Sequence, residues 1–274
     1  MKFADLHSHT NYSDGTSSPE ELAKKAIEAG LSCIALTDHD TVAGIKELIE
    51  SAVPLGLEVL PGVEISAEID EKEIHILGYL IDYNHPLLLE KLDLLRNNRI
   101  ARVHDITTKL NALGIALQAE DVFAISKRAI PSRSHIAKAL LRGGFISSIP
   151  EAFSRYIGDG KPAYSLGFRF SPKDAIDIIK GSGGIPVLAH PFILKDDNLV
   201  SEIIRLGVMG LEIYYPGLSQ GELNFYLDLA KKKNLLVSGG SDFHGEFKPD
   251  VRLGMVKLPY LFVEKLKEAK DSLR

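Results

Sequence analysis

The segment Phe3-Ala4-Asp5-Leu6-His7-Ser8-His9-Thr10 joins a short apolar run to a pair of histidines. Side chains at positions i and i+2 of an extended chain point the same way, so His7 and His9 can reach a single cation. The segment therefore predicts a strand over Phe3–Leu6 that ends in two metal ligands. Similar short apolar runs, each followed by polar side chains, recur through much of the chain.

These further runs predict most of the remaining strands. They are Cys33–Thr37, Glu58–Ile65, Ile74–Ile81, Pro186–Ala189, Gly210–Tyr214, Leu235–Ser238 and Met255–Leu258. Helical patterns lie among them at Pro19–Ala29, Thr41–Ser51, Pro172–Gly181, Asn198–Leu206, Gly221–Asn234 and Leu261–Leu273. Near-continuous apolar strands that alternate with helices are typical of a parallel sheet or a closed βα barrel.

The pattern changes between residues 87 and 165, where helical patterns replace the strands. From Arg96 to Lys173 there are 13 Lys and Arg against 5 Asp and Glu, a charge of +8. The whole chain carries −5, so the rest carries −13. We therefore expect a barrel built from residues 1–86 and 166–274, and an inserted helical, basic subdomain over residues 87–165 that covers the active site. An acidic scaffold with a basic insert suits cations on one part and an anionic ligand on the other.

Composition excludes several classes of protein. The 274 residues are 45% hydrophobic and 25% charged, which argues against disorder, coiled coil and fibrous repeats. The single cysteine, Cys33, excludes an internal disulfide and a thiolate-clustered zinc site. The start of the chain has no apolar signal core, and no run of about 18 apolar residues is present. We expect a cytoplasmic protein with no membrane segment and no obligate protein partner.

Nine residues that can bind a metal lie mostly at the ends of the predicted strands. They are His7, His9, Asp14, His39, Glu64, His75, His190, Asp242 and His244. The C-terminal ends of barrel strands meet on one face, where such folds carry out their chemistry. Imidazole and carboxylate ligands without thiolate suit zinc, manganese or iron. The sequence therefore predicts a metal centre on that face.

These motifs resemble the PHP family, named for polymerase and histidinol phosphatase. The resemblance is carried by Asp5–Thr10, Thr37–Asp40, Glu64, the strand end at His190, and Asp242-Phe243-His244. It implies a distorted (β/α)7 barrel with two to three divalent ions on its open face. It also implies the ligand sets: His7, His9, Glu64 and Asp242 for the first ion; Glu64, His75 and His190 for the second; Asp14, His39 and His244 for the third.

A second resemblance concerns the substrate. Ser13-Asp14-Gly15, Pro131–Ala137 and Gly158–Tyr164 are similar to the branch of nucleoside 3′,5′-bisphosphate phosphatases, some of which also trim short RNA 5′→3′. It implies that Asp40, Arg133 and His135 contact the substrate and take part in catalysis. From the residues alone, Asp40 can equally cap a helix that begins at Thr41, Arg133 can form a surface ion pair, and His135 can face solvent on a helix.

The constellation as a whole predicts hydrolysis. A carboxylate that bridges two cations holds them roughly 3.5–4 Å apart and so generates a metal-activated hydroxide from a shared water. The residues alone also permit amide or lactone hydrolysis, but the basic insert favours a phosphorylated substrate. We expect a metal-dependent phosphoesterase that removes the 3′-phosphate of nucleoside 3′,5′-bisphosphates and also trims short RNA. The alternatives are a phosphatase for histidinol phosphate or another small ester, and a non-catalytic metal- or nucleotide-binding module.

Overall fold

The computed structural model describes residues 2–127 and 129–273, which divide into two compact units. The first, here called the barrel unit, comprises the residues up to Lys91 and those from Phe170 onward. The second, here called the insert unit, comprises Leu92–Arg169. The long helix α3 (Pro86–Ala112) begins in the barrel unit and continues into the insert unit.

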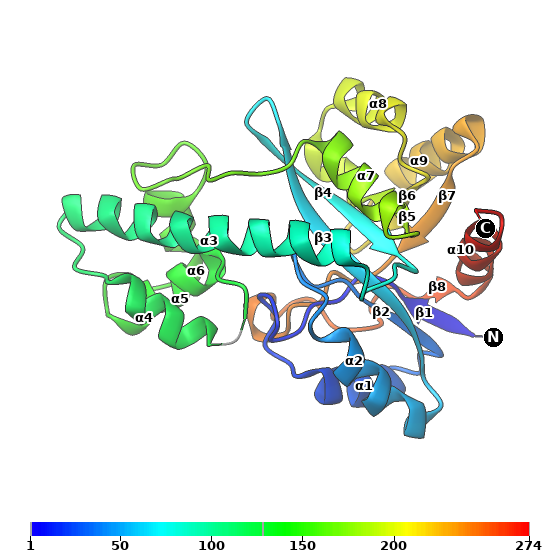
Figure 1. The fold of residues 1–274 in the computed structure, drawn as a ribbon, viewed down its shortest axis with the longest axis horizontal. Helices are drawn as coiled ribbons and strands as arrows, with labels where there is room; N and C mark the ends of the chain where they lie inside the picture. Colours follow the sequence, from blue (N-terminus) through cyan, green and yellow to red (C-terminus); the bar gives the residue numbers. More distant parts are fainter. Residues whose placement is uncertain (1, 128, 274) are drawn as a thin grey trace. The chain divides into compact units, whose positions relative to one another are not determined.

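The barrel unit contains one sheet whose strand order is β7-β6-β5-β4-β3-β2-β1-β8 (Figure 1). The strands are β1 (Phe3–Asp5), β2 (Cys33–Leu36), β3 (Glu58–Ile69), β4 (Lys72–Tyr79), β5 (Ile185–Leu188), β6 (Gly210–Tyr214), β7 (Leu236–Gly239) and β8 (Leu258–Pro259). The Leu6 amide donates to the Gly239 carbonyl at 3.0 Å, and Ser8 pairs with Phe243 in a parallel bridge. These contacts join the ends of β1 and β7, so the sheet is nearly closed, and the expected barrel of mixed α/β type is confirmed.

The direction of two strands, β4 and β8, differs from the prediction. Strands β3 and β4 pair antiparallel, as do β4 and β5, whereas the sequence pattern predicted parallel strands throughout. Only Asp70 and Glu71 separate β3 from β4, and both have positive φ, at 49° and 63°. A two-residue loop of this kind makes a hairpin, because a parallel crossover needs a dozen or more residues. The short strand β8 also pairs antiparallel, with β1. The sheet thus has eight strands, as the apolar runs predicted, whereas the resemblance implied seven.

Besides α3, the described residues of the barrel unit form six α-helices. They are α1 (Pro19–Glu28), α2 (Ile45–Ala52), α7 (Pro172–Gly181), α8 (Asp197–Leu206), α9 (Gln220–Lys233) and α10 (Leu261–Asp271). The predicted start of α1 is confirmed, because Ser18 and Glu21 form a reciprocal capping box. Helix α2 begins four residues later than predicted, at Ile45. The Cys33 side chain lies in the apolar core of the sheet, where burial raises the pKa of its thiol well above the usual value.

The insert unit is helical in its described residues. After α3 it contains α4 (Ala119–Ser126), α5 (Arg133–Arg142), α6 (Ile149–Ala152) and a wider π turn over Phe153–Ile157. Apolar side chains from these helices form a separate core that includes Ile106, Val122 and Leu140. Among the described residues of the whole chain, we find no helix with the length and apolar character needed to cross a membrane.

Candidate metal centre

The nine predicted ligands lie together in the barrel unit. His7 and His9 follow β1, and His39 follows β2. Glu64 lies within β3, and His75 faces the same region from β4. The remaining four follow β5 or β7 or lie in the turn after His9: His190, Asp242, His244 and Asp14. His75 reaches the cluster from an antiparallel strand, and Glu64 lies in the middle of β3, so neither lies at the end of a parallel strand.

Glu64 is the centre of this cluster. Its side chain is 1% exposed, and its two oxygens face different imidazoles. Oε1 lies 2.9 Å from Nδ1 of His75 and 3.4 Å from Nε2 of His190. Oε2 lies 3.1–3.2 Å from ring nitrogens of His7, His9 and His39. This division between two oxygens is what a carboxylate that bridges two cations requires.

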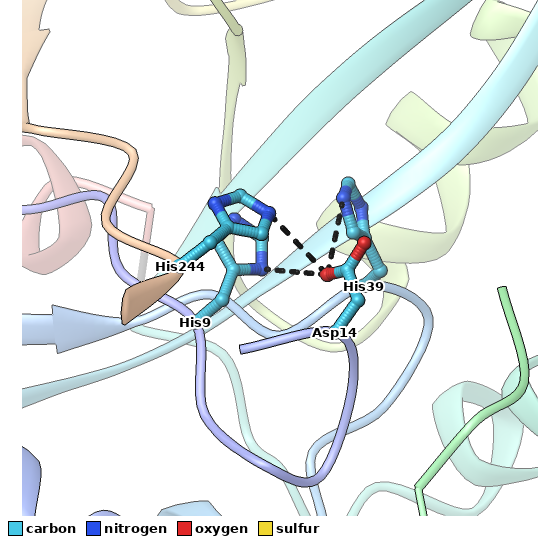
Figure 2. Close-up of side chains that lie close together, drawn as sticks. All are labelled: His9, Asp14, His39 and His244. Atoms are coloured by element: carbon cyan, nitrogen blue, oxygen red, sulfur yellow. Dashed lines mark ion pairs between the residues drawn. The ribbon is translucent and has the colours of Figure 1, made fainter. Parts of the chain in front are cut away.

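A second gathering of side chains surrounds Asp14 (Figure 2). Its Oδ1 lies 3.3 Å from Nε2 of His244, 3.9 Å from Nε2 of His39 and 4.0 Å from Nδ1 of His9. One possible ligand atom from each of these four residues lies within 4.8 Å of the others. The same holds for the group His7, His9 and Asp242 and for the group His39, Glu64 and His75. His9 and His39 are thus each shared by two groups, whereas the resemblance assigned each to one ion.

The donor atoms fit divalent cations. His9 Nε2, His39 Nδ1, His75 Nδ1, His190 Nδ1 and Glu64 Oε1 are buried and make no hydrogen bond within the part of the chain that the structure describes. An unsatisfied buried polar group costs about 1–3 kcal/mol, so a folded protein rarely gathers several without a ligand. The structure therefore contains several His and carboxylate clusters able to bind metal ions.

The charges within the cluster shift the pKa values of its side chains. Burial alone would raise the pKa of Glu64, but the imidazoles of His39, His75 and His7 lower it well below the usual value. Burial would lower the pKa of His9 and of His75. The carboxylates of Asp242 and Glu64, which lie 3.2–3.3 Å from its Nε2, raise that of His9 to about 9, and the negative charge of Glu64 raises that of His75 to about 10. The cluster thus holds protons at neutral pH when no cation competes for the same atoms.

One buried carboxylate beside the cluster was missed by the sequence analysis. Glu212 on β6 is fully buried, and its Oε1 lies 2.8 Å from Nδ1 of His7. Its Oε2 accepts a hydrogen bond from the backbone amide of His190 at 2.9 Å. Partners of this kind fix the ring orientation of a ligating histidine. The available signal was a single charged residue inside the apolar strand Gly210–Tyr214.

Two further aspartates hold the loops that carry the ligands. Asp38 accepts hydrogen bonds from the Thr10 amide at 2.7 Å and the Ser13 hydroxyl at 2.6 Å. Asp5 accepts from the amides of Ser241 and Gly254, each at 2.8 Å. Burial raises the pKa of both carboxyl groups.

Asp40 does not cap a helix. Helix α2 begins at Ile45 with Gly44 as its N-cap, and Asp40 Oδ1 accepts a hydrogen bond from the Ser66 amide at 2.8 Å. Its backbone has φ 53°, a left-handed conformation shared by His190 at 30° and Asp242 at 54°. Such conformations cost a non-glycine residue of order 1–3 kcal/mol and cluster at functional sites. The interpretation of Asp40 as a helix cap was wrong, and its substrate role stays a prediction.

Arg133 and His135 belong to the insert unit. Arg133 forms an ion pair with Asp159 at 2.6 Å, and its guanidinium lies 5.6 Å from the centre of the Tyr164 ring. His135 is the third residue of α5, and its Nδ1 accepts a hydrogen bond from the Ser132 amide at 3.2 Å. His135 is only 5% exposed, so the interpretation of a solvent-facing residue was wrong.

The fold is a nearly closed β-sheet with helices, and histidines and carboxylates cluster near the ends of its strands. This combination is typical of a metal-dependent hydrolase of the barrel type. Residues 5–158 match the PHP domain family. The chain is 36% identical over 247 residues to the 5′-3′ exoribonuclease Rnm of Escherichia coli, covering 88% of this chain and 84% of that protein. It is 32% identical over 259 residues to the 3′,5′-nucleoside bisphosphate phosphatase of Chromobacterium violaceum, covering 92% and 91%.

A solved structure extends this likeness to the fold. A Bifidobacterium adolescentis protein assigned to the metal-dependent phosphoesterases superposes with a TM-score of 0.88 at 31% identity, covering 97% of this chain and 95% of that one. The chain belongs to the PHP family, and it is a metal-dependent phosphoesterase.

Proposed function

We propose that this protein removes the 3′-phosphate from nucleoside 3′,5′-bisphosphates and also trims short RNA from its 5′ end. The observation that carries the proposal is the division of five imidazoles between the two oxygens of Glu64. The similarity to a bisphosphate phosphatase and to an exoribonuclease over most of both chains supports the choice of substrate. We also propose that the protein acts in the cytoplasm.

The proposed cofactors are two to three divalent ions of manganese, zinc or iron. The residues that would hold them are the nine of the cluster: His7, His9, Asp14, His39, Glu64, His75, His190, Asp242 and His244. When bound, such ions supply a water of lowered pKa and neutralise charge on the phosphoryl oxygens. Glu64 and Asp242 balance the positive charge, and Glu212 orients His7 through its 2.8 Å contact.

For substrate contacts we propose Asp40, Arg133 and His135. A guanidinium can bind a phosphate through two parallel hydrogen bonds, and the Arg133 side chain is partly exposed, at 19%. Asp40, whose carboxylate is held by the Ser66 amide, is proposed to accept a hydrogen bond from a hydroxyl of the substrate.

The substrate assignment is tested by phosphate release. Manganese-loaded protein is compared on 3′,5′-bisphosphoadenosine, histidinol phosphate and a 5′-phosphorylated RNA trimer. We expect strong release from the bisphosphate, nucleotide release from the trimer, and loss of both on chelation. Faster turnover of histidinol phosphate would favour the alternative phosphatase. No turnover of any substrate by fully metal-loaded protein would refute the nucleotide assignment.

Asp242→Asn tests the metal site. The amide has no negative charge and places a donor where Oδ2 now accepts, so we expect the rate of phosphate release to fall by more than about a hundredfold while the fold is retained. The matched control is Asp250→Asn, an exposed position eight residues along the chain, which should retain full activity. Undiminished turnover by Asp242→Asn would contradict the assignment.

A further inference from the structure

The two oxygens of Asp242 have different surroundings. Oδ1 faces histidines, at 3.3 Å from His9 Nε2, 3.3 Å from His244 Nδ1 and 3.5 Å from His7 Nε2. Oδ2 faces away from them and accepts a hydrogen bond from the Tyr215 hydroxyl at 2.7 Å. The ammonium of Lys248 lies 2.5 Å from the same oxygen. The carboxylate is therefore oriented so that one oxygen serves the ligand cluster and the other is held by the protein.

Tyr215 is itself well fixed. It follows strand β6 directly, and its ring packs against Phe192 with a centroid distance of 4.9 Å. The ring is also T-shaped to the imidazole of His190, with a centroid distance of 5.8 Å. The hydroxyl thus reaches Asp242 from a ring whose position is set by aromatic packing. Strand β6 supplies none of the nine cluster residues, yet Glu212 within it and Tyr215 just after it contact His7, His190 and Asp242 between them.

We propose that Tyr215 is a positioning residue, which presents Oδ1 of Asp242 to the cation by occupying Oδ2. The proposal rests on the metal site of the proposed function but not on its substrate. A carboxylate without this hydrogen bond can rotate about its last torsion, which is broad in aspartate, and exchange its two oxygens. Loss of a partner that orients a metal ligand lowers metal affinity by about 10- to 100-fold. Lys248 holds the same oxygen, but removing it changes the charge as well as the geometry, so Tyr215 gives the cleaner test.

The test is Tyr215→Phe, which removes the hydroxyl and keeps the ring that packs on Phe192. The matched control is Tyr214→Phe. Tyr214 precedes Tyr215 in the chain and packs against Phe262, so this variant loses the same hydroxyl from a ring with a different neighbour. The signal of free Mn²⁺ in electron paramagnetic resonance gives the dissociation constant without any turnover. We expect the Mn²⁺ dissociation constant of Tyr215→Phe to rise about tenfold, and that of Tyr214→Phe to stay within twofold of the unaltered protein.

Kinetics at saturating Mn²⁺ add a second readout. We expect Tyr215→Phe to lower kcat and leave KM within about twofold, because the hydroxyl acts through Asp242 and not on the substrate. An unaltered Mn²⁺ dissociation constant in Tyr215→Phe would overturn the proposal. If the unaltered protein binds Mn²⁺ but hydrolyses no nucleotide, the proposed substrate is wrong while the affinity comparison still decides the role of Tyr215.

A double-mutant comparison separates positioning from general support of the fold. In an Asp242→Asn background the oxygen pair that Tyr215 orients is gone, so adding Tyr215→Phe should change the Mn²⁺ dissociation constant no further. An equal loss in both backgrounds would show that Tyr215 acts independently of Asp242, and would also overturn the proposal.

Discussion

Glu212 shows how much a single buried residue contributes to the site without contacting a substrate. Its two oxygens accept from His7 Nδ1 and from the His190 amide. Glu212→Gln keeps the shape of the side chain but leaves one oxygen to accept from both His7 Nδ1 and the His190 amide. The new side-chain NH₂ group would therefore face one of these two N–H donors. We expect the Mn²⁺ dissociation constant to rise about tenfold, measured by titration calorimetry.

Glu264→Gln provides the control for this change, because Glu264 is exposed on helix α10. It should bind Mn²⁺ as the unaltered protein does. Equal affinities in the two variants would mean that the contact between Glu212 and His7 does not orient the imidazole.

At the scale of elements, the closure of the barrel depends on Gly240, which follows β7. A Cβ at this position would lie 2.3 Å from the His7 amide nitrogen and 2.5 Å from the His7 Cβ. The backbone of the first metal-binding segment would have to move. We expect Gly240→Ala to lower the free energy of unfolding by about 1–3 kcal/mol, measured by urea denaturation, and to weaken Mn²⁺ binding in the folded protein.

Gly221→Ala is the corresponding control in helix α9. An added Cβ there meets only Ser219 Oγ, at 3.9 Å, which is ordinary contact. Alanine has the higher helix propensity, so this variant should be equal in stability to the unaltered protein or more stable by up to about 1 kcal/mol. If Gly221→Ala destabilises the protein as much as Gly240→Ala does, the close approach of Gly240 to His7 has no special role in closing the barrel.

The positions of the strands could be predicted from the sequence, whereas strand direction and the residues that support the metal ligands could not. Apolar runs placed the strand Gly210–Tyr214 to the residue and most others within a few residues, because burial on both faces leaves a continuous signal. The direction of β4 was missed because an apolar run carries no direction, and the two-residue link at Asp70-Glu71 was the only local signal. Histidines at strand ends are visible in sequence, whereas Glu212 and Tyr215 act through other side chains and become apparent only when β6 is placed beside β5 and β7.

For the whole molecule, metal content and proton content are coupled. In protein stripped by a chelator, the pKa of His9 is raised to about 9 and that of His75 to about 10. A histidine whose pKa is raised on folding stabilises the protein fully below its unfolded pKa of about 6.5, and this contribution is lost as pH rises through the folded value. The unfolding temperature of the stripped protein should therefore fall between pH 7 and pH 10.

Metal binding should reverse this dependence, because a cation takes the nitrogen atoms that otherwise hold protons. We expect Mn²⁺ uptake at pH 7.5 to release protons, and Mn²⁺ affinity to increase as the pH is raised toward 9. Titration calorimetry in two buffers of different ionisation enthalpy measures the number released, since the observed heat then differs between the buffers. Identical heats in both buffers would show that the histidines are already neutral at pH 7.5, so the acidic groups around them, Glu64 above all, would not be holding protons in the cluster.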